Sequence, residues 1–126
     1  MIFSTLKSGN RAEIFACKFL SGKGYKIISR NFRTRFGEID IIALDEDVLC
    51  FVEVKFRKNS DFGFPEDFVD FRKQKKILKT AEIYLAKKKI SEVNIRFDIV
   101  GLLKSDNKNG YNARLIKNAF EGDIYG

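Results

Sequence analysis

Residues Gly37–Arg57 read GEIDIIALDEDVLCFVEVKFR, and this stretch decides the fold. Two apolar runs flank the polar triplet DED, a pattern that predicts two antiparallel strands joined by a tight turn. Three charged residues, Asp40, Glu53 and Lys55, interrupt the apolar runs. Removing an unpaired ion from water costs on the order of several kcal/mol, comparable to the net stability of a small domain. A compensating interaction is therefore expected around these charges.

The length of the turn decides whether Asp40 lies opposite Glu53. A two-residue loop, Glu46-Asp47, or a four-residue loop over residues 45–48 pairs the two carboxylates directly. A three-residue loop pairs Asp40 with Val52 unless a bulge shifts the register. In direct pairing the Cβ atoms are about 4.5–5.5 Å apart. Two anions at that separation repel, so one must be protonated, be paired with a cation, or share a bridging metal ion.

Strand alternation predicts two sets of residues that each share a face, namely Glu38, Asp40 and Ile42, and Phe51, Glu53 and Lys55. A divalent cation bridging Asp40 and Glu53 accounts for these charges, with the Val54 backbone carbonyl as a neutral ligand and Lys55 beside it. The alternative is a structural cluster in which Lys55 neutralises the carboxylates.

The composition narrows the chemistry. The chain has 126 residues, 44% apolar residues and 13 Phe, enough for one domain spanning residues 1–126. It has no histidine, which excludes a Ser-His-Asp triad, a Cys-His pair and imidazole metal sites. Carboxylates and carbonyls remain, and these ligands suit Mg²⁺ or Mn²⁺. The net charge of +7 favours a polyanionic partner, nucleic acid before an anionic membrane surface.

The chain lacks an apolar run long enough to span a membrane and an N-terminal export pattern, so a cytoplasmic protein without membrane attachment is expected. Cys17 and Cys50 are expected to be buried reduced thiols.

The sequence predicts the element order αβββαββ, and hence an α/β fold with a mixed sheet flanked by helices. The expected elements are a helix from Asn10 to the Gly22–Gly24 stop, strands Tyr25–Arg33, Glu38–Leu44 and Val48–Phe56, a loop Arg57–Pro65, a helix Asp67–Lys88, a strand Val93–Leu102, a turn KSDNKNG and a last strand 113–120.

Glu13 is polar but falls within the apolar side of the first helix, which comprises Ala12, Ala16, Cys17, Phe19 and Leu20. One interpretation is a capping box, with the Glu13 side chain reaching back to the Asn10 amide. The other is a carboxylate aimed across the sheet at a charged site.

Gln74 similarly lies within the apolar stripe of the long helix, formed by Phe71, Ile77, Leu78, Ala81, Tyr84 and Leu85. A buried amide needs partners, which a polar site beneath the helix or loop carbonyls would provide.

Four blocks occur in order along the chain: AEIFACKFLSGKGYKIISRNFR, GEIDII, FVEVKFR and FGFPEDFVDFRKQKK. Together, from about Gly9 to Val100, they resemble the uncharacterised bacterial YraN-like family (uncharacterised protein family 0102), a branch of the PD-(D/E)XK nuclease superfamily. The resemblance implies a restriction-endonuclease-like core and a Mg²⁺-dependent phosphodiesterase site. Ile39 stands where the superfamily name has proline, and Ala12 stands where glycine is expected.

Carried over to this chain, the resemblance implies a catalytic set of Asp40, Glu53, Lys55, Glu13 and Gln74, of which Gln74 is the looser match. Asp40 and Glu53 match the metal ligands, Lys55 matches the motif lysine, and Glu13 matches the helix carboxylate that often joins the ligands.

The leading hypothesis is a metal-dependent nuclease that hydrolyses nucleic acid, with DNA favoured over RNA, branched or structured DNA conceivable, and a homodimer allowed by analogy. The candidate phosphate-binding residues are Arg33, Arg35, Arg57, Lys58, Arg72, Lys75, Lys76 and Lys79. Two roles are open for three aromatic residues, which either stack on bases or cap the core: Phe36, Phe62 and Phe64. Two other interpretations are a non-catalytic nucleic-acid-binding module that retains the nuclease fold, and a basic adaptor for a protein or membrane.

Overall fold

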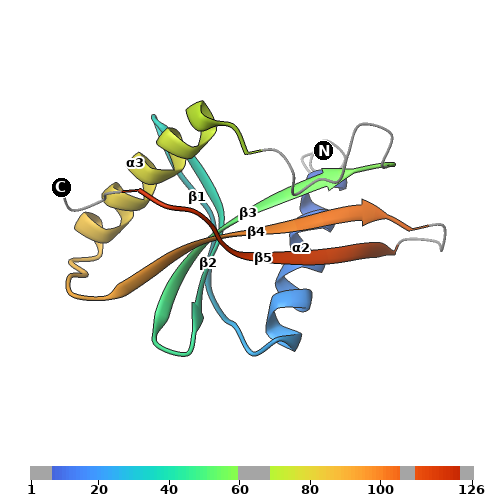
Figure 1. Ribbon diagram of the computed structural model, residues 1–126, viewed down its shortest axis with the longest axis horizontal. Helices are drawn as coiled ribbons and strands as arrows, with labels where there is room; N and C mark the ends of the chain where they lie inside the picture. The colour runs from blue at the N-terminus through green and yellow to red at the C-terminus, as the bar shows by residue number, and fades with distance from the viewer. Residues whose placement is uncertain (1–6, 60–68, 106–109, 123–126) are drawn as a thin grey trace.

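The computed structural model describes residues 7–59, 69–105 and 110–122, which form an α/β structure with a five-stranded mixed sheet between two helices (Figure 1). The elements are α2 (Lys7–Gly22), β1 (Lys26–Thr34), β2 (Gly37–Asp45), β3 (Val48–Arg57), α3 (Phe71–Lys87), β4 (Asn94–Lys104) and β5 (Tyr111–Phe120). The predicted order αβββαββ and the mixed sheet are confirmed, and the arrangement is consistent with a restriction-endonuclease-like core.

The strands lie in the sheet in their order along the chain, β1-β2-β3-β4-β5. β3 and β4 are parallel because α3 connects them across the sheet, and the other neighbouring strands are antiparallel. Figure 1 shows a strong twist, with β1 and β2 crossing the direction of β3, β4 and β5. α3 and α2 cover opposite faces of this twisted sheet.

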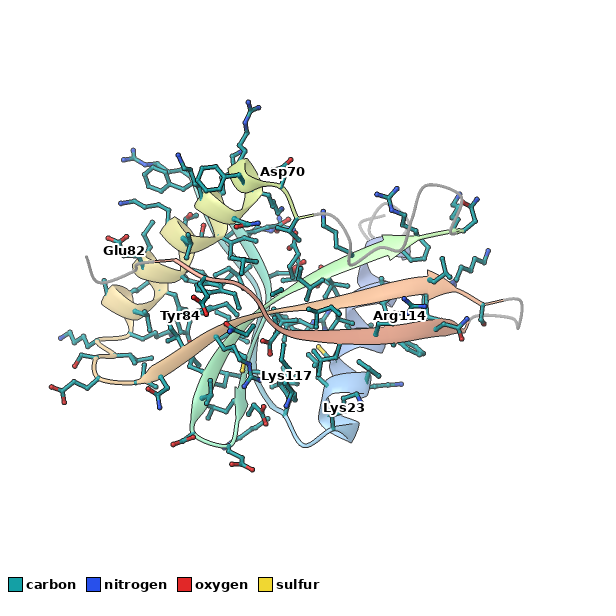
Figure 2. All side chains as sticks on the ribbon, in the orientation of Figure 1. Lys23, Asp70, Glu82, Tyr84, Arg114 and Lys117 are labelled. Atoms are coloured by element: carbon teal, nitrogen blue, oxygen red, sulfur yellow. The ribbon has the colours of Figure 1, made fainter. Side chains whose placement is uncertain are left out.

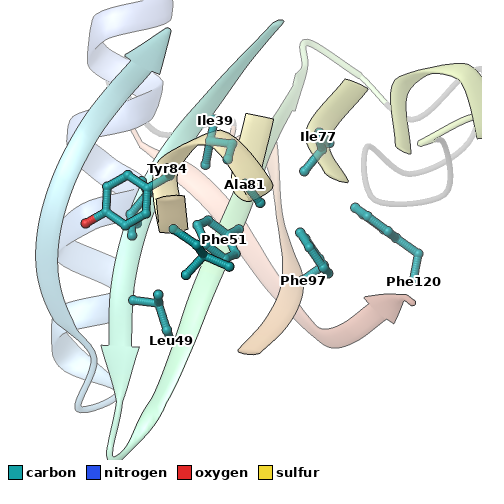
Figure 3. Close-up of a cluster of buried hydrophobic side chains, with 10 residues drawn as sticks. Ile39, Leu49, Phe51, Ile77, Ala81, Tyr84, Phe97 and Phe120 are labelled. Carbon is teal, nitrogen blue, oxygen red and sulfur yellow. The ribbon is translucent and has the colours of Figure 1, made fainter. Parts of the chain in front are cut away.

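Each face of the sheet carries its own apolar core. Phe51 and Phe97 stack at a ring-centroid distance of 5.5 Å beneath α3, where Ile77 and Tyr84 are also buried (Figure 3). On the opposite face, Ala12, Ala16 and Leu20 of α2 pack with residues of the sheet, among them Ile41, Val52 and Val100. Burying a large aliphatic or aromatic side chain stabilises a fold by about 1.5–3 kcal/mol, so these two cores hold both helices on the sheet.

Both helices begin at residues other than those predicted. α2 begins at Lys7, so Asn10 lies inside the helix and the prediction that it caps a helix beginning there is wrong. α3 begins at Phe71, because Asp70 is the N-cap and its Oδ1 accepts a hydrogen bond from Lys73 N at 2.8 Å. The predicted start at Asp67 is therefore too early, and Asp67 itself lies outside the described residues.

Phe71 does not belong to the apolar stripe of α3, contrary to prediction, because 68% of its surface is exposed. It begins the helix, more than one turn before Ile77, the first residue of α3 that is buried. The predicted loop residues Phe62, Phe64 and Pro65, and residues 106–109 of the predicted turn, lie outside the described part of the chain.

The β2–β3 hairpin has the two-residue loop Glu46-Asp47. Asp45 pairs with Val48 and Ile41 with Val52, so the same register places Asp40 opposite Glu53. The even two-residue loop, one of the predicted alternatives, is thereby confirmed, while the paired residues end at Ile41 and Val52.

Strict alternation along β2 is interrupted near Asp40. Ile39 and Ile42 both pack in the core beneath α3, whereas Ile41 packs beneath α2. Strand alternation predicted that Glu38 shares a face with Ile42, and this prediction is wrong. On the neighbouring strand, Asn31 has a positive φ of 55°, a local distortion at the same level of the sheet.

A buried polar network joins β4 to Tyr25 and to the loop end of β2. The Asp98 carboxylate is fully buried and accepts hydrogen bonds from the Tyr25 hydroxyl (2.8 Å), Arg96 Nε (2.8 Å) and Asn118 N (2.9 Å). Arg96 also bonds Asp45 Oδ2 at 2.8 Å. Each charge in the network has an opposite partner, which is the condition for burying ions without a large penalty.

Both cysteines are free, as predicted, although only Cys50 is fully buried. Burial, followed by the nearby Asp98 charge, raises the pKa of the Cys50 thiol to about 12, so it stays protonated at neutral pH. No helix of the described residues is long and apolar enough to cross a membrane.

Candidate active site at the carboxyl pair of the hairpin

The hairpin strands separate at the level of Asp40 and Glu53. The backbone pairing of β2 with β3 ends at Ile41 and Val52, although both strands continue. Beyond that point, Asp40 Oδ2 accepts a hydrogen bond from Val54 N at 2.8 Å. A carboxylate thus replaces the backbone of the neighbouring strand as the acceptor, which brings Asp40 against β3.

Asp40 and Glu53 form a hydrogen-bonded carboxyl pair. Burial, then the hydrogen bond to Glu53 and the negative charge of Glu53, together raise the pKa of Asp40 to about 9. The Val54 N–H opposes this shift because it favours the ionised form. Asp40 therefore keeps a proton at neutral pH, which it shares with Glu53 through the hydrogen bond. Little water reaches this site, because only 6% of the Glu53 surface is exposed.

Lys73 of α3 supplies the cation of this site. Its Nζ lies 3.4 Å from Glu53 Oε2 and forms an ion pair with it. Sequence reasoning missed this residue, because it considered Arg72, Lys75, Lys76 and Lys79 of α3 and gave Lys73 no role. The signal was available, because Lys73 precedes the buried Ile77 by four residues and therefore lies on the same side of the helix.

Lys55 follows Glu53 on β3, beside Gly101 of β4, and is half-buried. Within residues 7–59, 69–105 and 110–122, its ammonium makes no hydrogen bond or ion pair. The predicted alternative in which Lys55 neutralises the carboxylates is therefore replaced by one in which Lys73 does so.

Glu13 lies near the pair but is not part of it. Its Oε1 is 3.7 Å from an Arg30 guanidinium nitrogen, and this buried oxygen has no hydrogen-bond partner within the described residues. Burial is the main cause that raises the pKa of Glu13, and the Glu13 charge in turn raises the pKa of Asp40 slightly. Among the described residues, no group of three acidic or cysteine side chains is close enough to hold a metal ion together.

Gln74 takes the second of its two predicted roles, in which loop carbonyls satisfy its amide. Its Nε2 donates to the Val69 carbonyl oxygen at 2.8 Å, just before the start of α3. This hydrogen bond joins Val69, which precedes the helix, to the first turns of α3, which also contain Lys73.

The predicted phosphate-binding residues separate into three groups. Arg33 Nε donates to Glu38 Oε2 at 2.9 Å on the exposed part of the β1–β2 hairpin. Arg57 and Lys58 lie at the end of β3, where Lys58 is exposed. The remaining members gather on the outer side of α3 and the adjoining turn: Arg35, Arg72, Lys75, Lys76 and Lys79.

The donor set of the pair fits a divalent cation. Two buried carboxyl groups that share a proton can exchange it for a hard cation, since both then become ionised oxygen ligands. The unsatisfied Glu13 Oε1 adds a further buried oxygen nearby. The Val54 carbonyl stays a prediction as a ligand.

Fold and site together define an α/β protein, consistent with a restriction-endonuclease-like core, with a buried carboxyl pair where two central strands separate. The family model described as "Uncharacterised protein family UPF0102" matches residues 12–102. A UPF0102 protein of Persephonella marina is 43% identical over 122 residues, which cover 97% of this chain and 99% of the relative. A UPF0102 protein of Dictyoglomus turgidum is 46% identical over 112 residues, covering 89% of this chain and 95% of the relative. The chain belongs to this family.

Proposed function

We propose that this protein is a metal-dependent nuclease of the PD-(D/E)XK type that hydrolyses phosphodiester bonds in nucleic acid, with DNA as the favoured substrate. The observation that carries the proposal is the Asp40–Glu53 carboxyl pair. It is buried, it shares a proton, and it lies between strands that separate around it. Burying two carboxyl groups side by side costs stability, and a function in cation binding, which their oxygen donors fit, would explain why the protein keeps them.

In this proposal Asp40, Glu53 and the Val54 carbonyl hold Mg²⁺ or Mn²⁺, with Glu13 as an additional oxygen donor. When bound, the ion polarises a phosphate oxygen and lowers the pKa of a water molecule. Asp40 must release its shared proton to become a ligand, so the site is more readily filled as pH rises toward about 9.

Two lysines assist, one in an ion pair with Glu53 and one two residues along β3. Lys73 holds the Glu53 carboxylate in position through its ion pair. Lys55, which has no ion-pair partner in the described part of the chain, orients the attacking water or stabilises the charge that develops on phosphorus. The exposed cations of α3 contact backbone phosphates, which gives salt-dependent binding with little sequence information.

A non-catalytic nucleic-acid-binding module is the second candidate, and one observation favours it. Lys73 and the shared proton already compensate Glu53 and Asp40 without a metal ion. Such a module would bind nucleic acid through α3 and would leave phosphodiester bonds intact.

Cleavage assays separate these candidates. Labelled single-stranded, duplex, flap, four-way-junction and RNA substrates are incubated with Mg²⁺ or Mn²⁺ and with wild type, Glu53→Gln or Lys55→Ala. The nuclease proposal requires cleavage of at least one substrate, lost by 100-fold or more (on the order of 10²) in both variants while binding persists. Binding without cleavage in all three proteins supports the module.

A further inference from the structure

Two phenylalanines are exposed on the α3 side of the molecule. Phe71 exposes 68% of its surface and Phe36, in the turn between β1 and β2, exposes 40%. At least one cationic side chain lies over each ring. Lys75 Nζ lies 4.7 Å from the centroid of Phe71, and the Arg35 guanidinium and Lys79 Nζ lie 5.0 and 5.5 Å from that of Phe36.

These residues form one continuous surface, although they come from distant parts of the chain. A Cβ atom placed on Gly37 would lie 3.4 Å from both Lys76 Cβ and Thr80 Oγ1, so the β1–β2 turn rests directly on α3. Phe71, Lys75 and Lys79 follow each other at four-residue intervals along the helix, a span of about 12 Å. We call this set, Arg35, Phe36, Phe71, Lys75 and Lys79, the aromatic–basic surface.

The surface lies on the other side of α3 from the carboxyl pair. Lys73, in the first turns of the helix, points inward to Glu53, whereas Phe71 and Lys75 are exposed. Figure 2 shows rings and nitrogen-tipped side chains projecting from the outer side of α3, away from the sheet. A ligand bound to Phe71 therefore lies at the N-terminal end of α3, the same end from which Lys73 reaches Glu53 in the proposed active site.

Alternating π faces and cations match one ligand chemistry well. Unpaired bases stack on aromatic rings, and each such contact contributes about 1–3 kcal/mol regardless of the base, while Lys and Arg contact the phosphates between them. A duplex hides its bases in its own stack and offers these rings nothing to stack on. Lys79 is also 4.0 Å from Glu82, an exposed pair that leaves its ammonium beside Phe36.

We infer that the aromatic–basic surface binds single-stranded DNA, with unpaired bases stacked on Phe36 and Phe71. The inference deepens the proposed function, on which its biological meaning rests, by naming the substrate class. It predicts a nuclease that acts on single strands or on branched DNA with an unpaired segment.

Binding is measured without divalent cations, in EDTA, so that cleavage does not enter the result. The probes are a fluorescein-labelled 15-nucleotide oligo(dT) and a labelled hairpin duplex, followed by fluorescence anisotropy. Phe71→Leu and Phe36→Leu are each expected to weaken oligo(dT) binding by about 5-fold to 100-fold and duplex binding less than about 2-fold. Lys75→Gln should weaken both and lower the salt slope by about one ion.

Two controls accompany these variants. Phe71→Tyr keeps a π face and is expected to retain oligo(dT) binding. Phe56→Leu removes an exposed ring that packs on Tyr111 instead of a lysine of α3, and it should leave binding unchanged.

Unchanged oligo(dT) binding in both Phe36→Leu and Phe71→Leu overturns the inference, as does an equal loss for the duplex. Failure of wild type to bind oligo(dT) overturns it as well. The proposed function fails separately, since it requires cleavage in Mg²⁺ that depends on Glu53, whichever substrate is cut.

Discussion

Asp40 and Glu53 are joined through a shared proton, although they belong to different strands and lie where the backbone pairing of those strands stops. This relationship links the sequence to the proposed chemistry. The hairpin sets the two carboxyl groups opposite each other, burial raises the pKa of Asp40, and Lys73 balances the charge that remains on Glu53.

Asp40→Asn should stabilise the metal-free protein at alkaline pH. The folded-state pKa of Asp40 is about 9, above the ordinary carboxyl value, so the folded state holds a proton that the unfolded state releases between about pH 4 and 9. Stability is therefore fully present at low pH and falls across this window, by at most about 1.4 kcal/mol for each pH unit. Asn keeps the acceptor for Val54 N–H and removes this loss.

Urea unfolding of wild type and Asp40→Asn at pH 5 and pH 8 tests this expectation. The stability difference in favour of the variant should grow between the two pH values. An identical pH dependence in both proteins would show that Asp40 ionises normally.

Lys73→Met should bind Mg²⁺ several-fold more tightly than wild type, because the variant lacks the cation that competes for Glu53. It should also lose up to about 1 kcal/mol of metal-free stability, a modest value because Lys73 is partly exposed. Calorimetric titration and chemical unfolding measure the two effects. Lys76→Met serves as a matched control on the outer face of α3, and weaker Mg²⁺ binding in Lys73→Met would contradict this role.

Part of the fold and site could be predicted because local patterns specified it. The alternation of apolar residues and the short polar connection predicted the hairpin, whereas the length of its loop, and with it the position of Asp40 relative to Glu53, was left open until the structure showed two residues. Helical periodicity identified the buried faces of α2 and α3. The break in alternation between Ile39 and Ile42 was not predicted, since regular strand alternation does not encode it.

Long-range pairs also escaped prediction. Lys73 and Glu53 are distant in the sequence and meet only because α3 packs on the sheet, and Tyr25 meets Asp98 across most of the chain. Helical periodicity also did not show that Phe71, which begins α3 more than one turn before the buried Ile77, is exposed. The capping-box interpretation of Glu13 failed because α2 begins at Lys7 and not near Asn10.

Asp98→Asn should destabilise the fold by about 3–5 kcal/mol without altering the carboxyl pair. Asp98 is fully buried, and its substitution leaves the Arg96 guanidinium with only part of its negative partners. Lys117→Gln, which removes an exposed partner of Asp45, should cost less than about 1 kcal/mol. Thermal unfolding of both variants measures the two losses of stability. Similar losses would contradict the view that Asp98 contributes most of the stability of this network.

The account depends most directly on the ability of the Asp40–Glu53 pair to exchange its proton for a divalent cation. Isothermal titration of Mg²⁺ or Mn²⁺ into wild type and Asp40→Asn at pH 7.5, in two buffers of different ionisation enthalpy, measures both binding and proton release. The account predicts one site that releases about one proton per ion in wild type, weakened about tenfold or more in Asp40→Asn. No binding by wild type, or equal binding by the variant without proton release, would contradict it.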